Sequence, residues 1–287
     1  YLPLAKLTID FFRQHYLNRT AEGVLQVWPT QALETYWCEG WDNEHSRPPA
    51  DCCVNDMPTV AALHALLEKM RRLPQRFSTN DERAQWSKLH AALPALPTNA
   101  THLRAAEVYN ESASYNSEIP ELYSVHPYRL LSVGREVTGG ANLSKAVTSF
   151  KTDPNAACNE GWCQGVMVAA LLGQADRAAQ LVAGRASAAP AKGYRFPAFA
   201  QPYEDSEPSA DHFSNMMSGL QLMLMQPGDD AGSSIVLLPA WPCSWPVRFR
   251  LAGPRNTTVE VDYDGNGSST LMVTPPSRNS SVMFASC

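Results

Sequence analysis

The chain has 287 residues, 44% of them hydrophobic, and a formal net charge of −5 at pH 7. Such a chain is globular, with room for one large domain or two smaller ones. Lysine and arginine are scattered apart from short clusters such as Lys69, Arg71 and Arg72, which argues against a nucleic-acid partner. No apolar run reaches the roughly 18 residues of a transmembrane segment.

Helical periodicity dominates the first three quarters of the chain. Segment 57–73 shows the signals of a helix start, with a proline in its first turn and Asp56 or Asn55 as the N-cap. Long loops are expected at 18–55 and 94–140. The expected helices cover residues 2–17, 57–73, 80–93, 142–150, 162–173, 175–188 and 212–226.

The pattern changes near residue 228. After it come short alternating segments separated by Gly, Pro and Asn turns, which is typical of β-strands. The expected strands are IVLLP, VRFRLAG, TTVEVDYD, STLMVTP and SVMFASC. We therefore predict a mainly α fold with a C-terminal β domain, divided into a helical domain at 1–228 and a β domain at 229–287.

Asn-x-Ser/Thr sequons and cysteines indicate the compartment. Half of the 14 asparagines lie in sequons, and the seven cysteines do not have zinc-site spacing. Together they predict a disulfide-bonded glycoprotein that is secreted or lies at the cell surface, with neither metal nor cofactor. The sequons are at Asn18, Asn99, Asn110, Asn142, Asn256, Asn266 and Asn279.

Three disulfides are expected from cysteine placement. Cys158 and Cys163 are close in a glycine-containing loop, so we expect them to pair. Cys243 and Cys287 bracket the β domain, where a bond joins its first and last strands. Cys38 is expected to pair with Cys52 or Cys53, which fastens the loop around residue 34.

That loop reads VWPTQALETYW, residues 27 to 37, and places Glu34 among Trp28, Tyr36 and Trp37. A carboxyl group beside aromatic faces is what a sugar-cleaving site requires, because apolar walls raise the pKa of an acid and rings stack on pyranoses. The alternative is a salt-bridged corner of the core.

Paired helices separated by long, aromatic-rich loops fit an alpha/alpha toroid. A six-hairpin ring needs twelve helices, and about seven are expected here, so the helical part corresponds to a partial six-hairpin toroid followed by a small β-sandwich. The chain starts at Tyr1 rather than Met. We therefore expect a missing N-terminal part of the same precursor, or a partner chain, to cover the apolar faces that an open ring exposes.

Five segments in order resemble glycoside hydrolase family 95, the alpha-L-fucosidase family, and its six-hairpin relatives. They are PTQALET at 29–35, IPELYSVHPYRLLSVGR at 119–135, GWCQGVMVAALLG at 161–173, DHFSNMMSGLQLMLMQ at 211–226 and VLLPAWPCSWP at 236–246. The resemblance implies that Glu34 is the general acid and Asp211 the base that activates water. The alternative for Asp211 is a helix N-cap.

Further residues of these segments are candidates for substrate binding. Trp37, Trp41 and Trp162 are expected either to stack on sugars or to lie in the core. Glu121, His126 and Arg129 either bind hydroxyl groups or hold their loop through a buried ion pair. By alignment with the resembled family alone, the remaining candidates are Gln164, His212 and Asn215.

Two functions follow as expectations. The first is a secreted glycoside hydrolase that cleaves an alpha-linked terminal sugar, fucose-like or galactose-like, by inversion. The alternative is a non-catalytic extracellular or cell-surface glycoprotein of the same fold, which acts as a glycan-binding or structural subunit. In both, the partner is a glycan.

Overall fold

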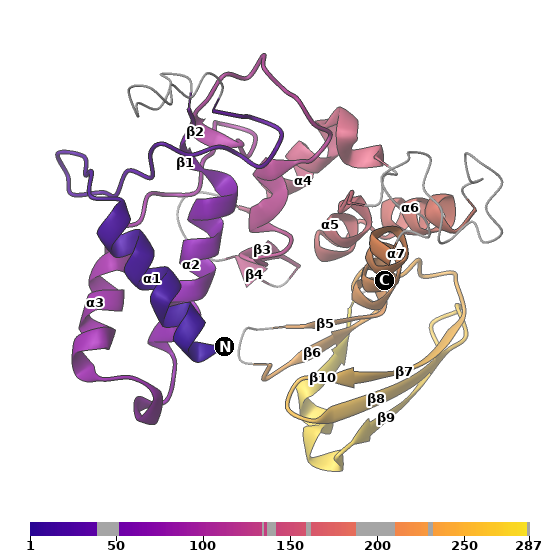
Figure 1. Cartoon of the computed structure of the whole chain (residues 1–287). Helices are drawn as coiled ribbons and strands as arrows, with labels where there is room; N and C mark the ends of the chain where they lie inside the picture. Colours follow the sequence, from indigo (N-terminus) through magenta and orange to yellow (C-terminus); the bar gives the residue numbers. More distant parts are fainter. Residues whose placement is uncertain are drawn as a thin grey trace. The chain divides into compact units, whose positions relative to one another are not determined.

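The computed structural model describes residues 1–38, 52–133, 135–136, 142–158, 162–187, 210–228 and 232–285. The chain folds into two compact units (Figure 1). The N-terminal unit comprises Tyr1–Leu130 and Val137–Asn155. The C-terminal unit comprises Leu131–Glu136 and Ala156–Cys287.

Four α-helices build the N-terminal unit, and all four lie where helical periodicity predicts them. They are α1 (Leu2–His15), α2 (Met57–Arg71), α3 (Asn80–Ala91) and α4 (Leu143–Thr152). Two short 3-10 helices, η1 (Gln75–Phe77) and η2 (Pro120–Ser124), lie between them, and η3 (Pro154–Ala157) follows α4.

The N-cap of α2 is Asp56, one of the two predicted residues. Its carboxylate accepts a hydrogen bond from Thr59 N at 2.8 Å. Asn55 has a different role, because its side-chain oxygen accepts a hydrogen bond from Val27 N at 2.7 Å and so ties the first long loop to the start of α2.

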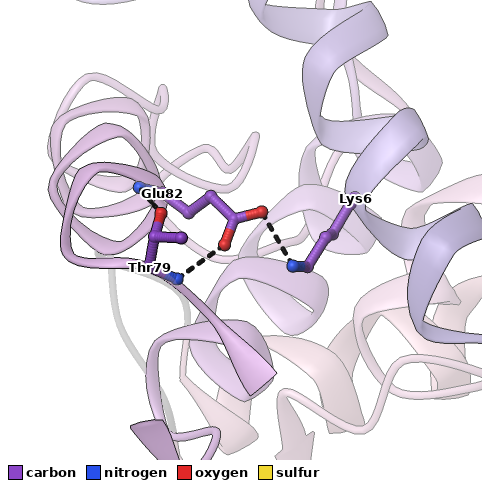
Figure 2. A network of polar contacts seen from close by, with 3 residues as sticks. All are labelled: Lys6, Thr79 and Glu82. Atoms are coloured by element: carbon purple, nitrogen blue, oxygen red, sulfur yellow. Dashed lines mark hydrogen bonds and ion pairs between the residues drawn. The ribbon is translucent and has the colours of Figure 1, made fainter. Parts of the chain in front are cut away.

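Helices α1, α2 and α3 share one hydrophobic core, and a polar contact joins α1 to α3. Lys6 Nζ lies 2.7 Å from Glu82 Oε1, while Glu82 Oε2 accepts from Thr79 N and Thr79 Oγ1 accepts from Glu82 N (Figure 2). This reciprocal capping box satisfies backbone donors at the start of α3. The buried core residues are Ile9, Leu25, Val27, Leu63, Leu67, Met70, Trp86, Leu89 and Leu93.

The two long loops of this unit contain a strand pair that periodicity does not reveal. Strand β1 (Val54–Asp56) pairs antiparallel with β2 (Ala106–Val108). Each strand has three residues, too few for a readable alternation of apolar and polar positions. The pair holds the loop after α1 against the loop after α3, which brings residues near 34 close to residues near 115.

The C-terminal unit begins with β3 (Leu131–Ser132) and β4 (Arg135–Glu136), followed by three helices. Helices α5 (Gly165–Leu171), α6 (Ala175–Ser187) and α7 (Ala210–Leu224) lie at predicted positions. Every residue of α5 is buried. At Gly219 of α7, an added Cβ would lie 2.1 Å from Val166 Cγ1 of α5, so glycine allows the close approach of these helices.

Two three-stranded sheets complete this unit, and the five predicted strands are confirmed (Figure 1). One sheet has the order β10-β6-β5, with β6 (Ile235–Leu237) antiparallel to β5 and parallel to β10. The other is the meander β7-β8-β9, and η5 (Pro276–Ser281) precedes β10. The remaining strands are β5 (Met225–Pro227), β7 (Val247–Gly253), β8 (Thr257–Tyr263), β9 (Ser269–Thr274) and β10 (Val282–Phe284).

Strand β5 was predicted as the end of the helix at 212–226, and this prediction is wrong for residues 225 and 226. The helix ends at Leu224 because the next three residues pair with β6, and Pro227 has no N–H to continue a helix. Both sheets share one core, which includes Leu224, Ile235, Val259 and Val261.

The division between units therefore differs from the predicted boundary at 228. Helix α7 runs directly into β5, and the Gln226 side chain donates a hydrogen bond to Ala170 O of α5 at 2.9 Å. These contacts place α5, α6 and α7 with the sheets rather than with the first four helices. The fold combines α-helices with small sheets.

Candidate functional site

Glu34 lies in a tight turn of the N-terminal unit, closed by paired hydrogen bonds between Ala32 and Tyr36 at 3.0 and 3.2 Å. Leu33 in this turn has a φ of 56°, the left-handed conformation that is uncommon for residues other than glycine. The side chain of Glu34 is exposed. Behind the turn, Thr30 Oγ1 donates to Asp56 Oδ2 at 2.7 Å, which anchors it to the start of α2.

A second segment, 115–118, lies alongside this turn. Tyr115 N donates to Thr35 O at 2.9 Å, and Thr35 Oγ1 donates to Glu118 O at 3.1 Å. Asn116 Nδ2 then donates to Glu34 Oε2 at 3.2 Å. Segments about 80 residues apart in sequence thus form one surface, which we call the Glu34 surface: Glu34, Trp37, Tyr115, Asn116 and Glu118.

An exposed aromatic pair lies on the same surface. The rings of Trp37 and Tyr115 stack with centroids 5.3 Å apart and an interplanar angle of 22°. Their exposed fractions, 46% and 47%, are high for such large rings. Flat aromatic faces beside hydrogen-bonding side chains are the groups that bind the apolar faces and hydroxyls of a pyranose.

The aromatic rings do not form the apolar enclosure predicted for Glu34. Tyr36 packs edge to face with Tyr109 at 4.7 Å, and Trp37 stacks on Tyr115. The partners of both rings come from the second long loop, which the sequence near Glu34 does not reveal. The Glu34 side chain is exposed to solvent and so is not enclosed by these rings.

Glu118 is a site residue that sequence reasoning missed. Its carboxylate accepts from Glu34 N at 3.4 Å, and burial, with the negative charge of Glu34, raises the pKa of Glu118 above its usual range. A second acid beside Glu34 therefore keeps its proton to higher pH than an ordinary glutamic acid. The only local signal was its position immediately before the IPELY segment.

Glu121 lies in η2, and its partner is a second carboxyl group rather than an arginine. Burial, reinforced by the charge of Asp153 and a hydrogen bond to it, raises the pKa of Glu121 to about 8. Asp153 follows α4, so the carboxyl pair joins η2 to the end of that helix. Burial, followed by the charge of Arg129, lowers the pKa of His126 to about 4, so this imidazole is neutral at pH 7.

The other predicted binding residues are distributed along the C-terminal unit. Trp162 is half-buried, with its indole Nε1 removed from solvent, and Gln164 is the N-cap of α5. Half-buried Asn215 lies on α7, as does His212. Trp41 lies outside the described residues.

Asp211 is exposed in the first turn of α7 and one residue inside the helix, which begins at Ala210. It is therefore not the N-cap, although a carboxylate in a first turn still interacts favourably with the helix dipole. Asp211 belongs to the C-terminal unit and Glu34 to the N-terminal unit. The separation expected for an inverting pair therefore stays a prediction.

Two predicted disulfides are confirmed, Cys38–Cys52 and Cys158–Cys163. The first fastens the loop after Trp37, and Cys53 beside it is buried. Cys243 also forms a disulfide. Its predicted partner, Cys287, lies outside the described residues, so that pairing stays a prediction.

Six of the seven sequon asparagines are exposed, and the seventh, Asn142, is half-buried. Asn142 Oδ1 caps α4 by accepting from Lys145 N at 3.0 Å. Within the described ranges, no helix has the length and apolar character needed to cross a membrane. The same residues contain no group of three or more His, Cys, Asp and Glu side chains arranged to hold a metal ion.

Comparisons with known proteins add no family to these observations. No protein-family model matches the chain, and no curated protein matches it.

Proposed function

We propose that the protein is a secreted or cell-surface glycoside hydrolase that removes an alpha-linked terminal sugar, fucose-like or galactose-like, from a glycan. The observation that carries this proposal is the Glu34 surface, where an exposed Trp37–Tyr115 stack adjoins a carboxyl group held by Asn116. The helices would belong to a six-hairpin toroid of the kind that the sequence resembles.

In this proposal, the sugar packs on the Trp37 or Tyr115 ring, and Glu34 donates a proton to the leaving oxygen. Glu118, whose pKa is raised by burial and by Glu34, acts as a neighbouring proton reservoir. Asp211 removes a proton from the attacking water on the opposite ring face. Inversion requires the acid and the base to be roughly 6.5–9.5 Å apart.

A second function, glycan binding without hydrolysis, is favoured by one specific observation. Glu34 is exposed, whereas a general acid that works near neutral pH is usually kept protonated by desolvation. An open surface with a stacked aromatic pair and an amide side chain is sufficient for binding. Both functions use the same contacts with the sugar, and they differ only in whether the glycosidic bond is broken.

The test is a screen of the native protein against aryl alpha-glycosides, with glycan binding measured in parallel. Glu34→Gln should lower hydrolysis by about 100-fold or more, since it removes the acid. The matched control is Glu22→Gln, an exposed glutamate of the same unit, which should retain full activity.

Trp37→Ala separates the two functions. If the wild type hydrolyses no glycoside but binds a glycan, and Trp37→Ala weakens that binding, the binding function is correct and the hydrolase proposal is wrong. If the wild type neither cleaves nor binds any sugar, both fail.

A further inference from the structure

Cationic side chains gather around a surface hollow of about 570 Å³ in the N-terminal unit, between the end of α2 and α3. Arg71 and Arg72 lie at the end of α2, and Arg83 and His90 face them from α3, with the hydroxyl of Ser87. A net charge of −5 for the chain means that this grouping does not follow from a basic composition.

The positive charge of this hollow is only partly neutralised. Its one acid, Glu68, pairs with Arg72 at 2.7 Å. Within the described parts of the chain, Arg71 and Arg83 have no carboxylate partner. Arg83 instead donates to the main-chain oxygens of Arg71 and Leu73, which fixes its guanidinium against the turn between the two helices.

The contact between His90 and Arg71 indicates the protonation state of the His90 ring. Arginine only donates, so the 3.0 Å contact between Arg71 Nη1 and His90 Nδ1 requires this nitrogen to accept. Burial, then the charges of Arg71 and His64, lowers the pKa of His90. The imidazole is therefore neutral at pH 7, and its state is sensitive to any anion placed beside Arg71.

Favourable interaction with the α2 helix dipole does not explain all of the cationic side chains around this hollow. Cations in the last turn of a helix interact favourably with its carbonyl end, which accounts for Arg71 and Arg72. It does not account for Arg83 and His90, which lie on α3. A second hollow of about 490 Å³, lined by Arg13, Arg19 and Lys88 among others, involves another face of α3 and is also cationic.

We propose that the hollow between α2 and α3 binds a tetrahedral oxyanion, and specifically a sulfate ester of an extracellular polysaccharide, a choice that rests on the secreted or cell-surface location proposed above. Guanidinium groups from α2, together with the Ser87 hydroxyl and His90 from α3, suit an anion with acceptor oxygens in several directions, and a tetrahedral oxyanion has this geometry. This site shares no residue with the Glu34 surface and does not depend on the proposed hydrolysis.

The first experiment titrates the whole chain with sodium sulfate, sodium phosphate and sodium chloride at constant ionic strength, and follows the His90 ring by NMR. Sulfate should bind with a dissociation constant of about 10 mM or lower and raise the pKa of His90, with chloride as the reference. Phosphate, which has the same geometry, should also bind. If sulfate shifts the His90 pKa no more than chloride does at the same ionic strength, the proposal is overturned.

The second experiment compares a sulfated oligosaccharide with its desulfated form by calorimetry, using Arg71→Gln/Arg72→Gln. Both arginines are exposed, so the melting temperature should not change. Affinity for the sulfated form should fall about tenfold or more, because two charge-assisted contacts are lost. The matched control, Arg248→Gln/Arg250→Gln, removes the same charge from the C-terminal unit and should bind normally.

Several outcomes would contradict the proposal. Equal binding of sulfated and desulfated sugar would show that the sulfate is not recognised, and equal loss in the control variant would show a general charge effect. Tighter binding of a phosphorylated sugar or of single-stranded DNA would identify a phosphate ligand instead. Each of these outcomes rejects the sulfated polysaccharide.

Discussion

At the scale of single residues, the acids of this protein differ mainly in how far each is removed from water. Glu34 is exposed, Glu118 is half-buried beside it, and Glu121 is the most strongly perturbed. Residue type and sequence neighbours did not distinguish them. For Glu121, burial is the main cause of the raised pKa, and Asp153, a partner far along the chain, reinforces it.

The Glu121–Asp153 pair makes stability depend on pH. The pKa of Glu121 is raised from 4.5 to about 8, so between these values the folded protein binds more protons than the unfolded chain. Stability should therefore fall as the pH rises from 5 to 8, by at most about 1.4 kcal/mol per pH unit from this group. Glu121→Gln should flatten this slope in urea unfolding measured at each pH.

The control for this prediction is Glu22→Gln. Glu22 is exposed, and a hydrogen bond from Thr20 lowers its pKa, so it does not titrate between pH 5 and 8. His126, with its lowered pKa, acts in the opposite direction, since its stabilisation is lost as the pH falls from about 6.5 towards 4. Identical slopes for wild type and Glu121→Gln across pH 5–8 would contradict the prediction.

At the scale of elements, the helices were predictable because the periods of α-helices are local. Within the described ranges, all seven α-helices and five of the strands lie where the sequence indicated. The strands that were not predicted are short. Strands β1, β2, β3 and β4 have two or three residues each, too few to show alternation, and β5 forms by pairing with β6. The contact of the turn around Glu34 with segment 115–118 is non-local, which is why Glu118 was not found.

Alanine substitutions at two helical glycines of the C-terminal unit test the packing of α5 against α7. Gly219→Ala should destabilise this unit, by roughly 1–3 kcal/mol, because the new methyl group overlaps Val166 on α5. Gly184→Ala in α6 is the matched control, since nothing lies within 4 Å of the added Cβ. It should stabilise by about 0.5–1 kcal/mol through helix propensity.

Urea unfolding of the two glycine variants measures both effects. Equal and stabilising effects at positions 219 and 184 would show that α5 and α7 are not in close contact. A loss at both positions would instead point to a general intolerance of side chains in these helices.

At the scale of the whole molecule, the outer face of α1 is notable because its apolar side chains are exposed to solvent. Leu4, Leu7 and Phe11 recur at helical spacing and are 65%, 65% and 52% exposed. The opposite face of the helix is buried, since Ile9 belongs to the core shared with α2 and α3. One helix therefore has apolar residues on two faces, and only one of them is covered within the described structure.

Apolar side chains grouped on a surface promote association in water, since burial is worth about 25 cal/mol per Å². The chain of residues 1–287 expressed alone should therefore self-associate. Leu4→Gln/Leu7→Gln/Phe11→Gln should be monomeric at concentrations where wild type is not, as measured by sedimentation velocity. Because these side chains are largely exposed, the melting temperature should change little.

A matched triple variant decides whether the α1 face is responsible. Leu271→Gln/Met272→Gln/Met283→Gln removes three exposed apolar side chains of the C-terminal unit, which are 39%, 54% and 51% exposed. If the α1 face drives association, this control should associate as strongly as wild type. A wild-type chain that stays monomeric and soluble would contradict the prediction, because the apolar face of α1 would then be stable in water without a cover.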